Sequence, residues 1–101
     1  MTKSELMNHI FQHPAMYLGH KSVIKMEAFI NGYAFSQLAE SEKMKDPLYD
    51  DFTQWIIKRY CVGQYPWSSV VLMIGVSEEK AFEVAKECWD EYKLEMSENP
   101  K

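Results

Sequence analysis

The sequence comprises 101 residues, of which 47% are hydrophobic and 14% aromatic, and its 15 acidic and 11 basic residues give a formal net charge of −4. This length and composition predict one folded domain over residues 1–101 rather than a disordered or multidomain chain. Arg59 is the one arginine, and the lysines are scattered among carboxylates. Nucleic-acid binding is therefore disfavoured, because displacing counterions requires clustered Lys and Arg. The acidic balance suits solubility or a basic protein partner.

The longest apolar run, residues 70–76, is far shorter than the ~20 residues that cross a bilayer, so we expect no membrane span. Residues 1–5 lead into an amphipathic segment without the apolar stretch of a secretory signal, and we expect a cytoplasmic protein. Cys61 and Cys88 form no CxxC motif, so each is predicted to be a small buried hydrophobic residue without a disulfide.

Four elements are predicted in the first part of the chain. Residues 4–12 form a short helix that ends before Pro14, because the residue preceding a proline is pushed out of the α region. Residues 14–19 form a compact apolar loop that we expect to be buried. Residues 22–40 have apolar positions at helical spacing behind Ser22 as N-cap, and Gly32 within this helix indicates a close contact with another backbone. The polar residues 41–45 form a loop.

The second part of the chain starts with Asp46 as an N-cap, followed by a proline in the first turn, and an amphipathic helix then continues to Gly63. Residues 64–66 form a turn. Residues 67–74 fit a buried helix and a buried strand equally well by periodicity, and we favour the helix because a strand would have no convincing partner. Ser77 caps a long final helix with a buried stripe to Met96, and residues 97–101 form a frayed tail.

These elements predict an all-α fold, a small bundle of four or five helices joined by short turns, with a strand at residues 67–74 as the alternative. No internal repeat interrupts the pattern.

Candidate catalytic and metal-binding residues are few. His9 and His13 are four residues apart, which suits a metal site, but the sequence offers no third ligand except His20 beyond the proline. Cys88 falls on the apolar stripe of the last helix, and Cys61 is near a helix C-terminus, where the helix dipole raises a thiol pKa. The glycines form no phosphate-binding motif. We therefore expect no cofactor, no metal and no catalytic residues, and thus not an enzyme.

Acidic residues of the last helix form a more specific pattern. Steps of four, four and three residues place four carboxylates on one helix face, opposite the predicted core stripe. This set, called the acidic ridge below, comprises Glu79, Glu83, Glu87 and Asp90. A solvated surface is the ordinary interpretation of such a pattern, and a docking strip for a basic partner is the functional one. Asp46, Asp50 and Asp51 form a second acidic patch.

Three aromatic residues lie in or beside predicted turns, namely Tyr49, Tyr65 and Trp67. An aromatic side chain exposed at such a place is a candidate anchor for an interface. The other aromatic residues are assigned to the core by their spacing.

Four short segments resemble a pattern in small bacterial immunity proteins that accompany polymorphic or contact-dependent growth-inhibition toxins. The segments are HPAMYLG at residues 13–19, MEAFINGY at 26–33, FTQW at 52–55 and EKAF at 79–82. The resemblance implies a small acidic protein that neutralises a cognate toxin domain by binding it tightly and covering its active site. It includes no catalytic signature.

The resulting hypothesis is an immunity protein, favoured as a monomer, that binds a toxin domain through the acidic ridge, with Asp46, Asp50 and Asp51 as a second contact. Many such toxins are nucleases, whose basic substrate clefts would attract an acidic surface. The partner would be a protein rather than nucleic acid or a membrane. Two alternatives stay open: an adaptor or regulatory subunit that binds another basic protein, and a small enzyme whose site is assembled from dispersed residues.

Overall fold

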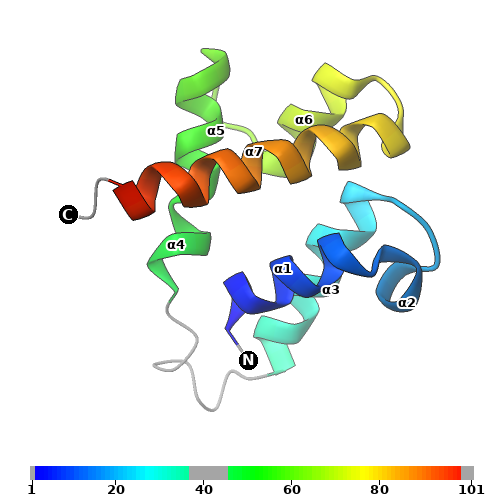
Figure 1. Cartoon of the computed structure of the whole chain (residues 1–101). Helices are drawn as coiled ribbons and strands as arrows, with labels where there is room; N and C mark the ends of the chain where they lie inside the picture. The colour runs from blue at the N-terminus through cyan, green and yellow to red at the C-terminus, as the bar shows by residue number, and fades with distance from the viewer. Residues whose placement is uncertain (1, 37–45, 99–101) are drawn as a thin grey trace.

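The computed structural model describes residues 2–36 and 46–98, and the regular structure in these two stretches is entirely helical. The longer helices are α1 (Lys3–Gln12), α3 (Val23–Ser36), α5 (Phe52–Tyr60), α6 (Trp67–Gly75) and α7 (Glu78–Glu98) (Figure 1). Two short helices, α2 (Pro14–Leu18) and α4 (Pro47–Asp50), connect them. The all-α prediction is confirmed, and residues 67–74 are helical rather than a strand.

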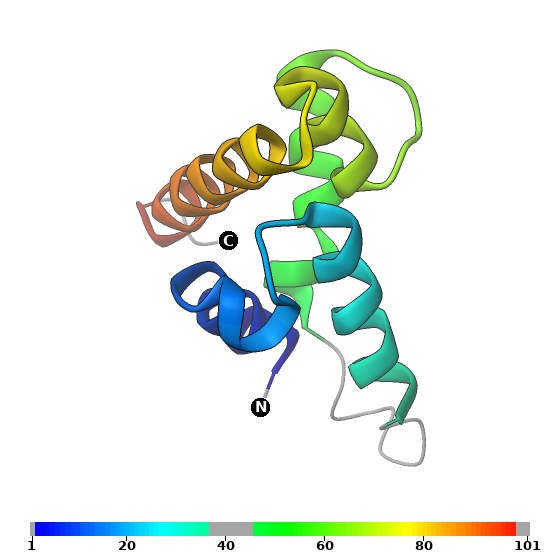
Figure 2. The ribbon, with the colours of Figure 1, turned by 90° about the vertical axis from the view of Figure 1, so that its right-hand side faces the viewer.

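Helix α7 organises the molecule. It runs across the fold beside α6 and α5, with α1 on its other side (Figures 1 and 2). Phe82 of α7 meets the Phe11 ring of α1 edge-on, with 5.3 Å between centroids. The buried stripe of α7 agrees with the sequence pattern and consists of Ala81, Phe82, Ala85, Cys88, Trp89 and Tyr92.

Phe52 of α5 lies at the centre of the aromatic core. Its ring centroid is 4.9 Å from that of Trp89, 5.2 Å from Tyr92 and 5.8 Å from Trp67. Phe52 is fully buried. Edge-on and tilted pairs of this kind add specific attraction to the burial of apolar surface, so this one side chain joins α5, α6 and α7.

The helix starts agree with the sequence signals. The Ser22 hydroxyl accepts a hydrogen bond from the Lys25 N–H at 3.2 Å, and the Ser77 hydroxyl accepts one from the Lys80 N–H at 3.2 Å. The Asp46 carboxylate accepts one from the Tyr49 N–H at 3.3 Å. Each bond satisfies a backbone donor that has no partner within the helix, so all three predicted N-caps are confirmed.

Two predictions of local structure were wrong in the first part of the chain. Residues 14–18 are helical, with Pro14 at the first position, and Leu18 alone among them is buried, while Met16 is 75% exposed. A Cβ at Gly32 would meet no atom within 4 Å, so this glycine makes no close backbone contact. Gly75 makes one instead, because a Cβ there would lie 2.5 Å from the Ala81 nitrogen.

The helix predicted from Asp46 to residue 62 is divided. The Leu48 carbonyl, which would accept the Phe52 N–H in a continuous helix, accepts the Tyr92 hydroxyl at 2.5 Å, and α4 ends at Asp50. Helix α5 then ends at Tyr60, with Cys61 in the left-handed conformation, rather than at Gly63. Residues 97 and 98, predicted to belong to a frayed tail, are part of α7. The predictions for residues 37–40, the loop at 41–45 and residues 99–101 lie outside the described residues.

Candidate protein-binding surface

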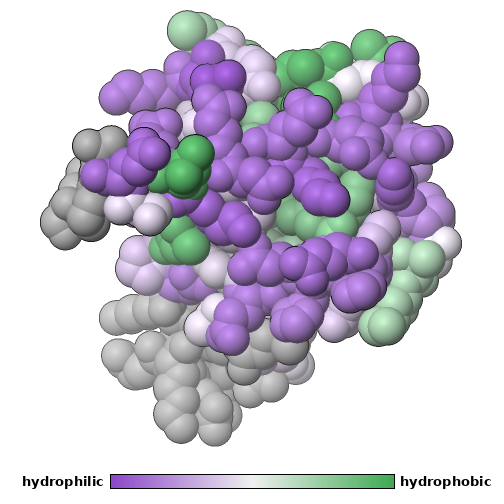
Figure 3. All heavy atoms as spheres, in the orientation of Figure 1, coloured by the Kyte–Doolittle hydropathy of each residue, from purple (hydrophilic) through white to green (hydrophobic). Residues whose placement is uncertain are grey.

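The acidic ridge lies on the solvent side of α7. Its four carboxylates are exposed, and the residues that α7 buries occupy the opposite side of the helix. Hydrophilic side chains cover α7 across the middle of the face in Figure 3. Residues 78–98 carry eight carboxylates and three lysines, whereas the rest of the chain has seven carboxylates and eight basic residues. The negative charge of the chain is therefore concentrated on this helix.

Two lysines approach the ridge. The Lys21 ammonium lies 2.5 Å from the Glu83 carboxylate, and Lys93 lies 3.8 Å from Asp90. The hydrogen bond to Glu83 raises the pKa of Lys21 above its usual value. Because these carboxylates are exposed to water and ions, such pairs hold them weakly. Both carboxylates remain open to a competing cation from a partner.

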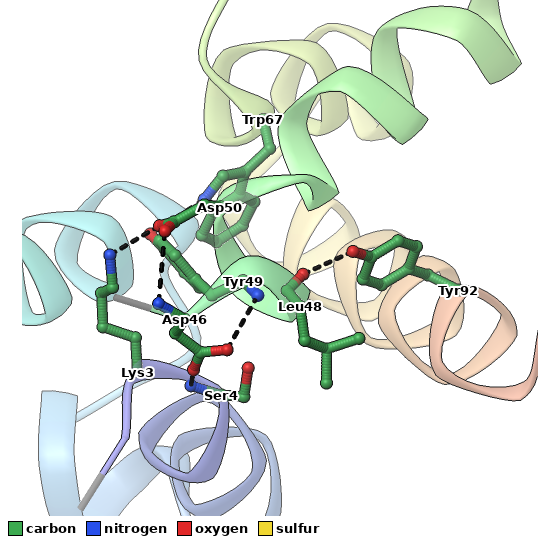
Figure 4. Close-up of polar contacts among 8 residues, drawn as sticks. All are labelled: Lys3, Ser4, Asp46, Leu48, Tyr49, Asp50, Trp67 and Tyr92. Atoms are coloured by element: carbon green, nitrogen blue, oxygen red, sulfur yellow. Dashed lines mark hydrogen bonds and ion pairs between the residues drawn. The ribbon is translucent and has the colours of Figure 1, made fainter. Parts of the chain in front are cut away.

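Asp46 of the second acidic patch has a structural role (Figure 4). Its side chain is buried, at 9% exposure. One carboxylate oxygen accepts the Ser4 N–H at 2.7 Å, while the other accepts the Tyr49 N–H at 3.3 Å. One side chain thus satisfies backbone donors in the first turns of both α1 and α4. The fold uses this carboxylate, and a partner would have to break these bonds to reach it.

The other two aspartates of this patch are more accessible. Asp50 accepts a hydrogen bond from the Lys3 ammonium at 2.6 Å, and Asp51 is exposed. Burial, together with the nearby charges of Asp51, Asp46 and Asp50, raises the pKa of Tyr92 to about 12. The patch therefore lies by Tyr92, about 20 Å along α7 from Glu79.

The predicted aromatic anchors have different positions. Trp67 is buried, at 2% exposure, and its indole N–H donates to the Tyr49 hydroxyl at 3.3 Å. Burial raises the pKa of Tyr49 to about 12. Tyr65 alone of the three is exposed, at 51%. Trp67 is a core residue rather than an interface anchor, because its ring fills the space beside Phe52.

Residues considered for catalysis are dispersed. Cys88 is buried beside the Tyr60 hydroxyl at 3.3 Å, and burial raises the pKa of its thiol, which disfavours the reactive thiolate. Cys61 is exposed, contrary to the sequence prediction, because it caps α5 in a left-handed turn. Both cysteines are free. Within residues 2–36 and 46–98, His9, His13 and His20 belong to no group of three potential metal ligands.

Sequence reasoning missed an apolar surface at the elbow between α6 and α7. Met73, Ile74 and Val76 are 56%, 41% and 86% exposed. The predicted buried element at residues 67–74 included Met73 and Ile74, because an apolar run carries no signal for which side a helix presents to solvent. The backbone of Val76 has a φ of +73°, which sequence periodicity does not register.

Comparison with protein-family models, with curated proteins and with solved structures gives no match. In the part of the chain that the structure describes, none of the helices is both long and apolar enough to span a membrane.

Proposed function

We propose that this chain is an immunity protein that binds a cognate bacterial toxin domain, with the acidic ridge of α7 directed into the basic substrate cleft of that domain. The observation that carries this proposal is the accumulation of exposed carboxylates on one helix of an otherwise nearly balanced chain. The resemblance of the four segments to immunity proteins supports a toxin domain as the partner. The charge of α7 supports a partner with a basic binding surface.

The ridge suits binding in two physical respects. Helix α7 is held by the aromatic core along its inner side, so its outer carboxylates are presented on a rigid support. Clustered charge of one sign accelerates encounter with an oppositely charged cleft and disfavours partners of the same charge. A nuclease cleft binds the negatively charged phosphates of its substrate, and a row of carboxylates presents negative charge to the cleft in the same way.

Genomic position and co-expression test the proposal. A toxin-encoding open reading frame immediately upstream is expected. Co-expression of this chain with the encoded toxin domain should restore growth, and the two proteins should co-purify. The absence of such a reading frame, or failure of both rescue and co-purification, would contradict the immunity function. Co-purification with an unrelated basic protein would favour the adaptor alternative.

Charge variants of α7 test the surface. Glu83→Lys combined with Glu87→Lys should weaken toxin binding by more than tenfold, a size typical of removing a central interface contact. Lys86 is exposed beside these residues, so Lys86→Glu changes the charge in the opposite direction and should strengthen binding. Glu98→Lys, at the far end of α7, is the matched control and should bind as the wild type does. Equal affinity for all variants would remove the ridge from the proposal.

A further inference from the structure

Helix α3 is apolar on the side that it turns away from the rest of the fold. Its inner side buries Val23, Met26 and Ile30 against neighbouring helices. On the opposite side, Ile24 is 52% exposed and Phe35 is 73% exposed. A helix that is apolar on two opposite sides is ordinarily covered on both. The outer side of α3 is therefore a candidate contact surface.

The exposed residues of this outer side form one row, which we call the α3 row. It consists of Ile24, Ala28, Asn31 and Phe35, all of which are exposed. Steps of four, three and four residues place them along one line of the helix, as in the contact seam of two paired helices. Gly32 borders the middle of the row, and a Cβ there would meet no atom within 4 Å, so another backbone can approach closely.

The order of side chains along the α3 row selects a second copy of this chain as its occupant. Each end carries a large apolar side chain, whereas the middle carries Ala28 and Asn31. Two antiparallel α3 helices, related by a two-fold axis at the middle of the row, would place Ile24 of each copy against Phe35 of the other. Ala28 of each copy would face Asn31 of the other. A two-fold interface requires this kind of self-complementarity.

The distribution of charge favours the same occupant. Copies of a chain with a net charge of −4 repel each other, most strongly through the acidic ridge. The α3 row contains no charged residue, and the two charges of α3 itself, Lys25 and Glu27, cancel. A strongly charged partner would gain no attraction from such a surface. Figure 2 shows α7 on the left and α3 on the right, so pairing through the α3 row keeps the two acidic ridges apart.

We propose that the α3 row is a homodimerisation surface, through which two copies of this chain pair antiparallel across a two-fold axis. The row is about 16 Å long, so the interface belongs to the small ones, and the dimer should dissociate readily on dilution. This inference goes beyond the proposed function and does not depend on it. It replaces the monomer that the sequence hypothesis favours, and each dimer presents two acidic ridges.

Sedimentation velocity on the full chain, from about 10 μM to about 1 mM, tests the pairing. The wild type should pass from monomer to dimer as concentration rises. Ala28→Glu places a carboxylate in the middle of the row at an exposed helical position, so circular dichroism should be unchanged while the dissociation constant rises more than tenfold. Asn31→Leu should lower the dissociation constant, because a polar residue within a helix seam reduces its stability.

Met73→Glu is the matched control, because it places the same charge on an exposed apolar side chain of another surface, the α6–α7 elbow. This variant should dimerise as the wild type does. A chain that remains monomeric at about 1 mM overturns the proposal. A dimer that Met73→Glu weakens as much as Ala28→Glu does also overturns it, because pairing would then not be specific to the α3 row.

An intermolecular nuclear Overhauser effect tests the antiparallel register. The sample mixes chains that carry isotope-labelled isoleucine methyl groups with unlabelled chains. A filtered signal from the Ile24 methyl groups of one copy to the Phe35 ring of the other is expected. Within one chain these side chains stand about 16 Å apart along α3, too far for such a signal. A dimeric sample without it, or with contacts between two Ile24 side chains instead, would refute the antiparallel α3 pair.

Discussion

The carboxylates of the acidic ridge and those around Asp46 are chemically alike, but the fold places them in opposite environments. Glu79 and Glu87 are exposed on the outer side of α7. Asp46 is buried and accepts backbone N–H groups from two helices. A buried carboxylate with backbone partners stabilises the fold, whereas exposed carboxylates on a rigid helix contribute little to stability and are free to act on a partner. The two regions therefore predict opposite responses to mutation.

The largest expected effect on stability comes from Asp46→Ala. It removes the N-cap of α4 and leaves the buried Ser4 N–H in the first turn of α1 without its acceptor, so the free energy of unfolding should fall by about 2–3 kcal/mol. Urea denaturation followed by circular dichroism measures the loss. The exposed neighbour provides the control, since Asp51→Ala should change stability by less than about 0.5 kcal/mol. Equal effects of the two substitutions would erase the distinction between the two environments.

The next effect concerns the elbow that joins the ridge helix to α6. Gly75→Ala places a methyl group against the Ala81 backbone and should destabilise the fold by about 1–3 kcal/mol. Gly32→Ala, in the same denaturation assay, should instead stabilise α3 by up to about 1 kcal/mol, because its Cβ would enter open space within a helix. If both substitutions destabilise equally, the close approach at Gly75 is not the feature that fixes the elbow.

These two glycines also illustrate which parts of the fold the sequence predicts. Local signals were sufficient for α1, α3 and α7, for the N-caps at Ser22, Asp46 and Ser77, and for the buried side of α7, because helical periodicity and capping act within a few residues. They missed the helix α2 and the break between α4 and α5. Whether a glycine packs against another backbone depends on which helices meet there. A sequence pattern at Gly32 or Gly75 contains no information about that contact.

The same distinction between local and non-local signals explains why only part of the candidate site could be predicted from the sequence. The spacing of the ridge residues along one helix predicts their common face. The bond between Asp46 and Ser4 joins residues 42 positions apart, so its structural role could not be seen locally. The positive φ of Val76 likewise arises from the packing of α6 on α7 and has no local signature such as a glycine.

A third expectation concerns alkaline pH near the Asp46 region. Tyr49 and Tyr92 each have a pKa raised to about 12 by burial, above the ordinary value of 10.0. The folded state therefore holds these protons more tightly, and its stability is fully present below pH 10 and is lost as pH rises from about 10 to 12. Denaturation across this range, with tyrosinate absorbance, measures the effect. Tyr92→Phe should reduce the slope of the free energy of unfolding against pH between about pH 10 and 12. An unchanged slope would show that Tyr92 does not contribute to this pH dependence.

The smallest expected effect on stability is that of Lys21→Ala, which removes the lysine paired with Glu83 of the acidic ridge. Its ion pair with Glu83 is exposed, so the melting temperature should not change measurably. Toxin affinity should rise slightly, because Glu83 then lacks an internal competitor. Lys3→Ala is the comparison near Asp46, where the 2.6 Å contact with Asp50 involves a less exposed lysine and should matter more for stability. A larger stability loss from Lys21→Ala than from Lys3→Ala would reverse the comparison.

The affinity of this chain for the proposed toxin domain, measured as a function of ionic strength, tests the central claim most directly. If the ridge is the binding surface, affinity should fall steeply as salt rises, and the slope should become much shallower when Glu83 and Glu87 are replaced by lysine. An affinity that is independent of salt, or a slope that this double substitution leaves unchanged, would contradict the assignment of α7 as the surface that recognises a basic partner.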